Sequence, residues 1–305
     1  MNPVIKIDEL RSDFVKFRLR GVSLAYANAL RRIMIAEVPT MAIEFVTFLE
    51  NTTPLHDEFI SHRLGLLPLL SHSVDSFNFP SECACNESGN VCSVCSVKFT
   101  LKVKNNNEQA MDVTSEHLIA DAQNEAQRSV KPVKYKIELE GRMVERDVLL
   151  MRLGANQELS LECVAKKGIG KMHAKWSPVC VTSLRFEPMV QLNSLRAMEL
   201  SEAQRKGLVA SCPKKVFDYN NKSEMLEVVR PTDCIYCGEC EAFANELDIE
   251  DLVKIEEGEF IFEVESTGSL KAEEIVDFSI FQLQKKINAS ITALRELSFP
   301  DEHIH

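Results

Sequence analysis

Apolar and polar residues alternate through the first twenty positions, with the two-residue period of a β-strand. An Arg-Ser-Asp turn divides the stretch into two runs, and Gly21 follows the second run. The alternating apolar positions of the two runs include Ile5, Ile7, Phe14, Phe17 and Leu19. The pattern predicts a β-hairpin over residues 5–19.

The period then changes to that of a helix. Leu24, Ala27, Leu30 and Met34 recur at intervals of three or four, with Ser23 before them as a possible cap and Pro39 after them. We therefore expect an amphipathic helix over residues 23–37.

The middle of the chain favours β-structure. Residues 97–165 contain short runs of alternating character, such as 97–104, 133–140 and 159–166, separated by polar segments. They predict a mostly β domain inserted into the chain. Further β-rich sequence follows residue 168, with a short helix over 201–213 and a strand over 260–267.

The last segment has the clearest pattern in the sequence. One apolar stripe continues over about five helical turns and consists of Val276, Ile280, Leu283, Ile287, Ile291 and Leu294. A stripe of this length predicts a long helix with an apolar partner. Periodicity alone leaves open whether that partner is the chain's own domain or a second chain.

Composition restricts the class of protein. The chain has 305 residues, 45% hydrophobic and 27% charged, as soluble globular proteins do. Neither an apolar run of membrane-spanning length nor a signal pattern is apparent, so we expect an intracellular protein. The net charge of −11 argues against a free-standing nucleic-acid-binding protein, which needs a basic face.

Four of the ten cysteines lie within one short loop, residues 83–95, called the cysteine loop below. Cys83 and Cys85 form one pair, and Cys92 and Cys95 form a second. Four thiolates can surround a zinc ion tetrahedrally. The spacing therefore predicts a structural zinc site, and four protein ligands leave no open position for catalysis.

A second set of cysteines has the spacing that iron–sulfur proteins use. It comprises Cys212, which precedes Pro213, and the triplet Cys234, Cys237 and Cys240. The Cys-Pro element precedes the triplet, the reverse of the bacterial ferredoxin order. An iron–sulfur cluster, a zinc ion and unligated thiols all stay open, and with them the hypothesis of an iron–sulfur redox protein.

No catalytic motif accompanies these cysteines. The sequence lacks a Walker-type phosphate loop, a nucleophile elbow and a zinc-protease motif, and the Gly-Ile-Gly-Lys run at 168–171 lacks the third glycine of a dinucleotide loop. The sequence therefore favours a protein that is not itself an enzyme.

Three stretches together resemble a known family. They are ANALRRIMIAEVPTMAIE (27–44), DEFISHRLGLLPL (57–69) and GIGKMHAKWSPV (168–179). They resemble, in the same order, the assembly-platform subunits of cellular RNA polymerases, which include bacterial alpha, its archaeal homologue and the third-largest subunit of RNA polymerase II. The similarity runs along nearly the whole chain.

The resemblance implies an α+β fold with a discontinuous alpha-type dimerisation domain over residues 1–47, 168–205 and 256–305. It also implies an inserted, mainly β domain over 48–167 that carries the cysteine loop, and a small ferredoxin-like or cysteine-bearing lobe over 206–255. By the same resemblance, the dimer interface would use Leu30, Ile33, Met34, Val276, Ile280, Leu283, Ile287, Ile291 and Leu294.

The implied function is non-catalytic assembly of a DNA-directed RNA polymerase, a nucleotidyltransferase complex in the nucleus. The implied partners are a small alpha-like subunit, the second-largest subunit and two very small zinc-binding subunits, with DNA and RNA reached only through the complex.

Two features distinguish branches of the family. The Cys-x-Cys and Cys-x-x-Cys pairs and the HAKWSP run resemble the RNA polymerase II branch rather than the homologue shared by polymerases I and III. Cys212, Cys234, Cys237 and Cys240 match the iron–sulfur cluster positions of the archaeal homologue. The equivalent subunit of polymerases I and III and the archaeal homologue are therefore the alternatives within the family.

Overall fold

The computed structural model describes residues 2–86, 92–139, 141–221, 223–249 and 251–298. The chain forms two compact units, each built from separate stretches. Unit 1 contains Met1–Asp8, Phe17–Ser23 and Ser183–Phe262. Unit 2 contains Glu9–Lys16, Leu24–Thr182 and Glu263–His305.

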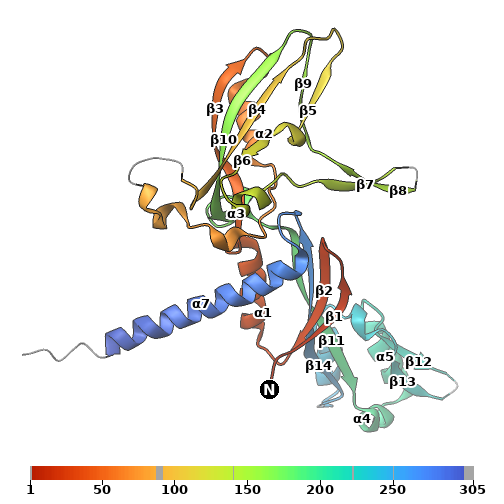
Figure 1. Cartoon of the computed structure of the whole chain (residues 1–305). Helices are drawn as coiled ribbons and strands as arrows, with labels where there is room; N and C mark the ends of the chain where they lie inside the picture. The colour runs from red at the N-terminus through yellow and green to blue at the C-terminus, as the bar shows by residue number, and fades with distance from the viewer. Residues whose placement is uncertain (1, 87–91, 140, 222, 250, 299–305) are drawn as a thin grey trace, which may run out of the picture. The chain divides into compact units, whose positions relative to one another are not determined.

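Unit 2 is built around an antiparallel sheet of order β3-β10-β4-β6, which Figure 1 shows above α1. Its strands are β3 (Pro39–Asn51), β10 (Glu158–Ile169), β4 (Ser96–Lys104) and β6 (Ile119–Asp121). The core on one face of this sheet includes Met41, Phe99, Leu101 and Leu161, all nearly inaccessible to solvent. The short helix α2 (Asp57–Gly65) adds Ile60 and Leu64 to that core.

Two further pairs of strands belong to unit 2. One is β5 (Met111–Thr114) with β9 (Leu149–Leu153), and the other is the hairpin of β7 (Tyr135–Leu139) and β8 (Arg142–Arg146). Helix α3 (Glu125–Ser129) is capped by the Asn124 side chain, which accepts from the Gln127 backbone N–H at 2.8 Å. Figure 1 shows the β7–β8 hairpin projecting from the rest of unit 2.

Two helices of unit 2 pack together, α1 (Leu24–Ala36) and α7 (Ala272–Ser298). Lys286 of α7 donates to Glu37, just after α1, at 2.8 Å. The carboxyl-terminal half of α7 extends beyond α1 (Figure 1). Within the described residues, no helix combines the length and the apolar character that crossing a membrane requires.

Unit 1 contains most of a four-stranded sheet of order β1-β2-β14-β11. The strands are β1 (Val4–Leu10), β2 (Phe14–Arg20), β14 (Val253–Ser266) and β11 (Val179–Leu192). Phe17 and Phe262 stack with ring centroids 4.7 Å apart.

The rest of unit 1 has its own core, formed by residues that include Leu208, Phe217 and Leu252. Its elements are α4 (Ser194–Glu199), α5 (Glu202–Ser211), β12 (Phe217–Asn220), β13 (Met225–Val228) and α6 (Glu239–Glu246). A capping box begins α5, in which Ser201 and Gln204 exchange backbone and side-chain hydrogen bonds.

The structure confirms the elements that the sequence pattern predicted most directly. They are the amino-terminal hairpin, helix α1, the strands β4, β7 and β10, helix α5 and the long helix α7. Helices α2 and α6 and the full 13-residue length of β3 were not predicted. The mixed helix and sheet content agrees with the expected fold class, whereas the domain bounds derived from the resemblance stay a prediction.

Candidate metal centre and dimerisation helix

Four thiols converge in the cysteine loop. The Sγ atom of Cys85 lies 3.3 Å from those of Cys83 and Cys95, and Cys92 lies 3.3 Å from Cys95 and 3.5 Å from Cys83. All four sulfur atoms lie within 4.8 Å of one another. The spacing in the sequence therefore brings together the four residues that it predicted, although residues 87–91 of the loop lie outside the described residues.

The base of the cysteine loop is held by backbone hydrogen bonds. Asn78 donates to the Val94 carbonyl at 3.0 Å, and both the backbone N–H and the hydroxyl of Ser96 donate to the Cys92 carbonyl. Ser96 begins β4, so the second cysteine pair is joined directly to the central sheet.

Lys167 of β10 holds the segment before the first cysteine pair. Its ammonium group donates to the Phe77 carbonyl at 2.9 Å and lies 4.9 Å from the centre of the Phe79 ring. Burial lowers the pKa of Lys167, while nearby Asp75 and Glu82 oppose the shift. Sequence reasoning missed this residue, because nothing in a lysine's position within a strand indicates that it supports a loop.

The thiols influence one another's protonation. Burial raises the pKa of Cys92, but hydrogen bonds from Cys95 and Cys85 outweigh burial and lower this pKa to about 6. Hydrogen bonding with Cys83, Cys92 and Cys95 raises the pKa of Cys85. The opposite pKa shifts of Cys92 and Cys85 follow from crowding, because two adjacent thiolates repel each other.

The donor set fits a metal ion. Thiolate sulfur is the ligand that zinc prefers in closed structural sites, and four such ligands complete a tetrahedron. Among the described residues, these four cysteines are the one group of at least three potential ligands placed to hold an ion. A bound cation would remove the repulsion between thiolates and tie the two cysteine pairs together.

The second cysteine set surrounds a small cavity in unit 1. Cys212, Cys234, Cys237 and Cys240 all line it, together with apolar residues. The Cys212 sulfur accepts from the Val216 backbone N–H at 3.4 Å, and burial raises the pKa of Cys240 to about 11. The cavity volume of about 10 Å³ suffices for about one water molecule.

The backbone between these cysteines curves sharply. Tyr236 and Gly238 have φ angles of 54° and 76°, so the Cys234–Cys240 segment wraps around the cavity. The four thiols nevertheless do not form a group placed for a single ion. An iron–sulfur cluster with several irons holds its cysteine sulfurs farther apart than one zinc ion does, because each sulfur binds a different iron. Such a cluster would also need more room than this cavity has.

The apolar stripe of α7 divides into two parts. Val276, Ile280 and Leu283 are half-buried, whereas Ile287, Ile291 and Leu294 are exposed by 49%, 41% and 62%. Phe281, which the predicted stripe did not include, is also exposed. The second half of the helix therefore presents apolar side chains that the described part of the chain leaves accessible to solvent.

The predicted interface residues of α1 lie inside the chain. Leu30, Ile33 and Met34 are at most 4% exposed, whereas Leu24 and Ile35 of the same helix are accessible. Helical spacing identifies an apolar face but does not tell whether a partner or the chain's own core covers it. The assignment of these three residues to a dimer interface stays a prediction.

The resembling stretches contact one another. A Cβ atom on Gly168 would lie 2.3 Å from the Trp176 ring, and one on Gly170 would lie 2.3 Å from the Ile35 carbonyl oxygen. Thr40 donates to the Trp176 carbonyl at 2.8 Å, and the Trp176 indole donates to the Lys166 carbonyl at 3.1 Å. The Gly-Ile-Gly run thus permits close packing against Trp176 and the Ile35 carbonyl.

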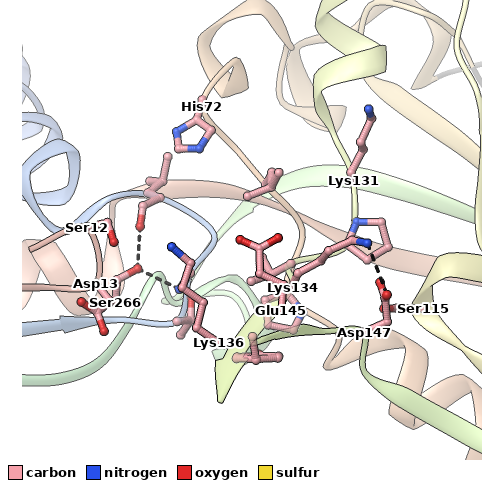
Figure 2. A pocket seen from close by; sticks show the side chains of 18 of the residues that line it. Ser12, Asp13, His72, Ser115, Lys131, Lys134, Lys136, Glu145, Asp147 and Ser266 are labelled. Carbon is pink, nitrogen blue, oxygen red and sulfur yellow. Dashed lines mark hydrogen bonds and ion pairs between the residues drawn. The ribbon is translucent and has the colours of Figure 1, made fainter. Parts of the chain in front are cut away.

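A groove of about 1380 Å³ lies elsewhere in unit 2. Figure 2 shows its charged lining, in which Lys134 pairs with Asp147 at 3.3 Å and Lys136 and Glu145 of the β7–β8 hairpin line the same space. Acidic and basic side chains are mixed along its walls, without the clustered donors of a phosphate site or the metal ligands of a catalytic centre.

Comparison with known proteins places this architecture in a class of polymerase subunits. Residues 16–287 match the model of the RNA polymerase Rpb3/Rpb11 dimerisation domain. The match covers most of the chain, including α1, the cysteine loop and most of α7. The chain belongs to this family.

Individual relatives agree along almost their whole length. The chain is 41% identical to the DNA-directed RNA polymerase II subunit rpb3 of Dictyostelium discoideum, over 93% of this chain and 92% of the relative. It is 39% identical to subunit 3 of the RNA polymerases II, IV and V of Arabidopsis thaliana, over 94% and 90%. It is 31% identical to the archaeal polymerase subunit Rpo3 of Methanosphaera stadtmanae, over 96% and 98%.

Proposed function

We propose that this protein is an assembly subunit of DNA-directed RNA polymerase II that pairs with a small alpha-like subunit. The observation that carries the proposal is the exposed half of the α7 stripe, within a chain that belongs to a dimerisation family. Exposed apolar side chains at helical spacing require a complementary helix, because water contact with them is unfavourable. A partner helix packed along Ile287, Ile291 and Leu294 would provide that cover.

The proposed role is structural rather than catalytic. A centre of four thiolates, with zinc as the metal proposed for it, has no open coordination position for water or substrate. Its task would be to fix a loop that contributes few residues to a core. The groove in unit 2 presents paired charges rather than a nucleophile next to a base.

The proposed domain arrangement follows the resemblance. Residues 1–47, 168–205 and 256–305 would form the dimerisation domain, 48–167 the inserted β domain and 206–255 the cysteine lobe. The second-largest subunit and two very small zinc-binding subunits would join the heterodimer, and the complex would act in the nucleus, reaching DNA and RNA only through its large subunits.

RNA polymerase II is the enzyme that the comparisons favour. The two most similar relatives described above carry its subunit name, whereas the archaeal relative is less similar. The four converging thiols of the cysteine loop also support this branch over the subunit shared by polymerases I and III.

A metal at the second cysteine set stays a separate proposal. Four cysteines around one cavity favour an iron–sulfur cluster over zinc, because they are not grouped for a single ion. Cluster binding would require the thiols to separate from their present positions. A purely redox function is disfavoured, since it would leave the α7 stripe and the dimerisation family unexplained.

Purification of the tagged chain from its own cells tests the proposed function. We expect the small alpha-like subunit and the large subunits of RNA polymerase II to be recovered together, as identified by mass spectrometry. Recovery of subunits specific to polymerase I or III would assign the chain to another enzyme. Recovery of the chain without any polymerase subunit would refute the proposal.

A further inference from the structure

The β7–β8 hairpin has a polar side and an apolar side. Residues opposite each other in an antiparallel pair point to the same face. On the polar side, Lys136 lies opposite Glu145 and Glu138 lies opposite Met143. The other side, called the hairpin face below, consists of Tyr135, Ile137, Leu139, Arg142, Val144 and Arg146.

The hairpin face is accessible. Ile137 and Leu139 are 40% and 41% exposed, and Val144 is half-buried. Among the described residues, β7 and β8 pair only with each other. A hairpin of two strands is marginally stable in water unless its apolar side is covered. An additional surface packed against the hairpin face would therefore stabilise it.

The polar side contributes more residues to the groove of unit 2 than the hairpin face does. Lys136, Met143 and Glu145, from the polar side, line the groove, and Figure 2 shows Lys136 and Glu145 there. From the described residues of the hairpin face, only Tyr135, at its base, lines the groove as well. Ile137, Leu139 and Val144 are therefore not used by the groove to which the hairpin contributes.

The charges on the hairpin face have one sign. Arg142 and Arg146 flank Val144 on β8, and the described residues of this face include no carboxylate. Neither arginine forms an ion pair or a side-chain hydrogen bond within the described part of the chain, whereas nearby Lys134 is paired with Asp147. Two guanidinium groups beside aliphatic side chains are complementary to a partner surface that supplies both apolar groups and carboxylates.

We propose that the hairpin face is the docking surface for an acidic, amphipathic segment of another polymerase subunit. The inference rests on the proposed function, which provides the multisubunit complex. Apolar residues of the segment would cover Ile137, Leu139 and Val144, and its carboxylates would accept bidentate hydrogen bonds from the two arginines. An apolar centre with arginine is typical of protein–protein interfaces, whereas phosphate contacts are made mainly by cationic and polar donors.

This surface is separate from the dimerisation surface in the sequence. The hairpin face lies within 135–146 and the exposed half of α7 within 287–294. Substitutions in one set leave the side chains of the other set unchanged. Loss of one contact can therefore be measured while the other is retained.

A photo-reactive benzoylphenylalanine residue at position 137, introduced into the tagged chain in cells, tests the proposal directly. The intact polymerase is purified and irradiated, and the crosslinked peptide is identified by mass spectrometry. We expect a crosslink to an acidic segment of another subunit from position 137, and none to that segment from position 143 on the polar side. A crosslink from position 137 to nucleic acid, to this chain alone or to no partner overturns the proposal.

Charge reversal provides the second arm. The double variant Arg142→Glu and Arg146→Glu should reduce the crosslink yield from position 137 at least about tenfold, while the small alpha-like subunit is retained. The matched control is Glu138→Arg on the polar side, which should leave the yield unchanged. An equal yield in the double variant and the control overturns the proposal.

The two arms also separate this inference from the proposed function. If the tagged chain enters no polymerase, the proposed function fails. If the polymerase assembles normally and position 137 gives no crosslink to another subunit, only the docking surface fails.

Discussion

At the scale of single residues, packing explains features that otherwise resemble binding motifs. Gly168 and Gly170 occur in a run similar to a phosphate-binding loop, yet the space beside them is filled by Trp176 and by the Ile35 carbonyl. Sequence reasoning could reject the dinucleotide loop from the missing glycine. It could not identify the ring that requires Gly168, because that contact depends on the fold of the segment that follows.

Replacing Gly168 by alanine should destabilise the protein. The added methyl group would lie 2.3 Å from the Trp176 ring, so the ring or the end of β10 must shift, which costs about 1–3 kcal/mol of unfolding free energy. Chemical denaturation measures the change. Gly65→Ala is the matched control, because its new Cβ would meet the Ile43 carbonyl at an ordinary 3.7 Å. Equal stability of the two variants would contradict the packing role of Gly168.

The cysteine loop provides the second prediction for single residues. Cys92→Ser removes one of the four converging thiols, so we expect the loop to lose most of its bound zinc while pairing with the alpha-like subunit persists. Elemental analysis of the anaerobically purified heterodimer measures zinc, and its iron count reports on the second cysteine set. Cys180→Ser is the control, since Cys180 is outside both sets. Full zinc content in Cys92→Ser would contradict the site.

At the scale of elements, long periodic segments were predictable and short ones were not. The stripe of α7 repeats over many turns, so its helix is evident from the sequence. Helix α2 has only Ile60 and Leu64 in the core, and α6 has only Cys240 and Ala244 buried, so neither produces a clear period. Their positions depend on tertiary packing, as is usual for short helices.

The candidate sites also differ in how far the sequence predicts them. Cys83, Cys85, Cys92 and Cys95 were predictable because metal ligands in one loop keep a short, regular spacing. The sequence could not predict whether Leu30, Ile33 and Met34 are accessible to a partner chain, because an apolar face gives the same pattern whether α7 or another chain covers it. Lys167 was missed because its role depends on a segment about ninety residues away.

The exposed half of α7 gives the prediction at this scale. Ile287→Asp places a carboxylate within the proposed interface, where burying an unpaired charge costs several kcal/mol. We expect the variant to lose the small alpha-like subunit in a pull-down. Ala289→Asp introduces the same charge on another face of the exposed helix and should retain the partner. Equal retention by both variants would exclude this stripe from the interface.

At the scale of the whole molecule, an assembly role explains observations that a redox function leaves unrelated. The family match spans residues 16–287, the α7 stripe extends past α1, and the cysteine loop is joined to the central sheet rather than to an open cleft. Together these features fit the proposed assembly role. The hairpin face would add a second contact surface.

The most direct measurement is the mass of the purified protein when it is coexpressed with the small alpha-like subunit. Size-exclusion chromatography with light scattering should show a single species whose mass is that of this 34.4 kDa chain plus one copy of the partner. The Ile287→Asp variant should elute separately from the partner. A wild-type chain that stays a monodisperse monomer of 34.4 kDa beside the soluble partner would contradict the account.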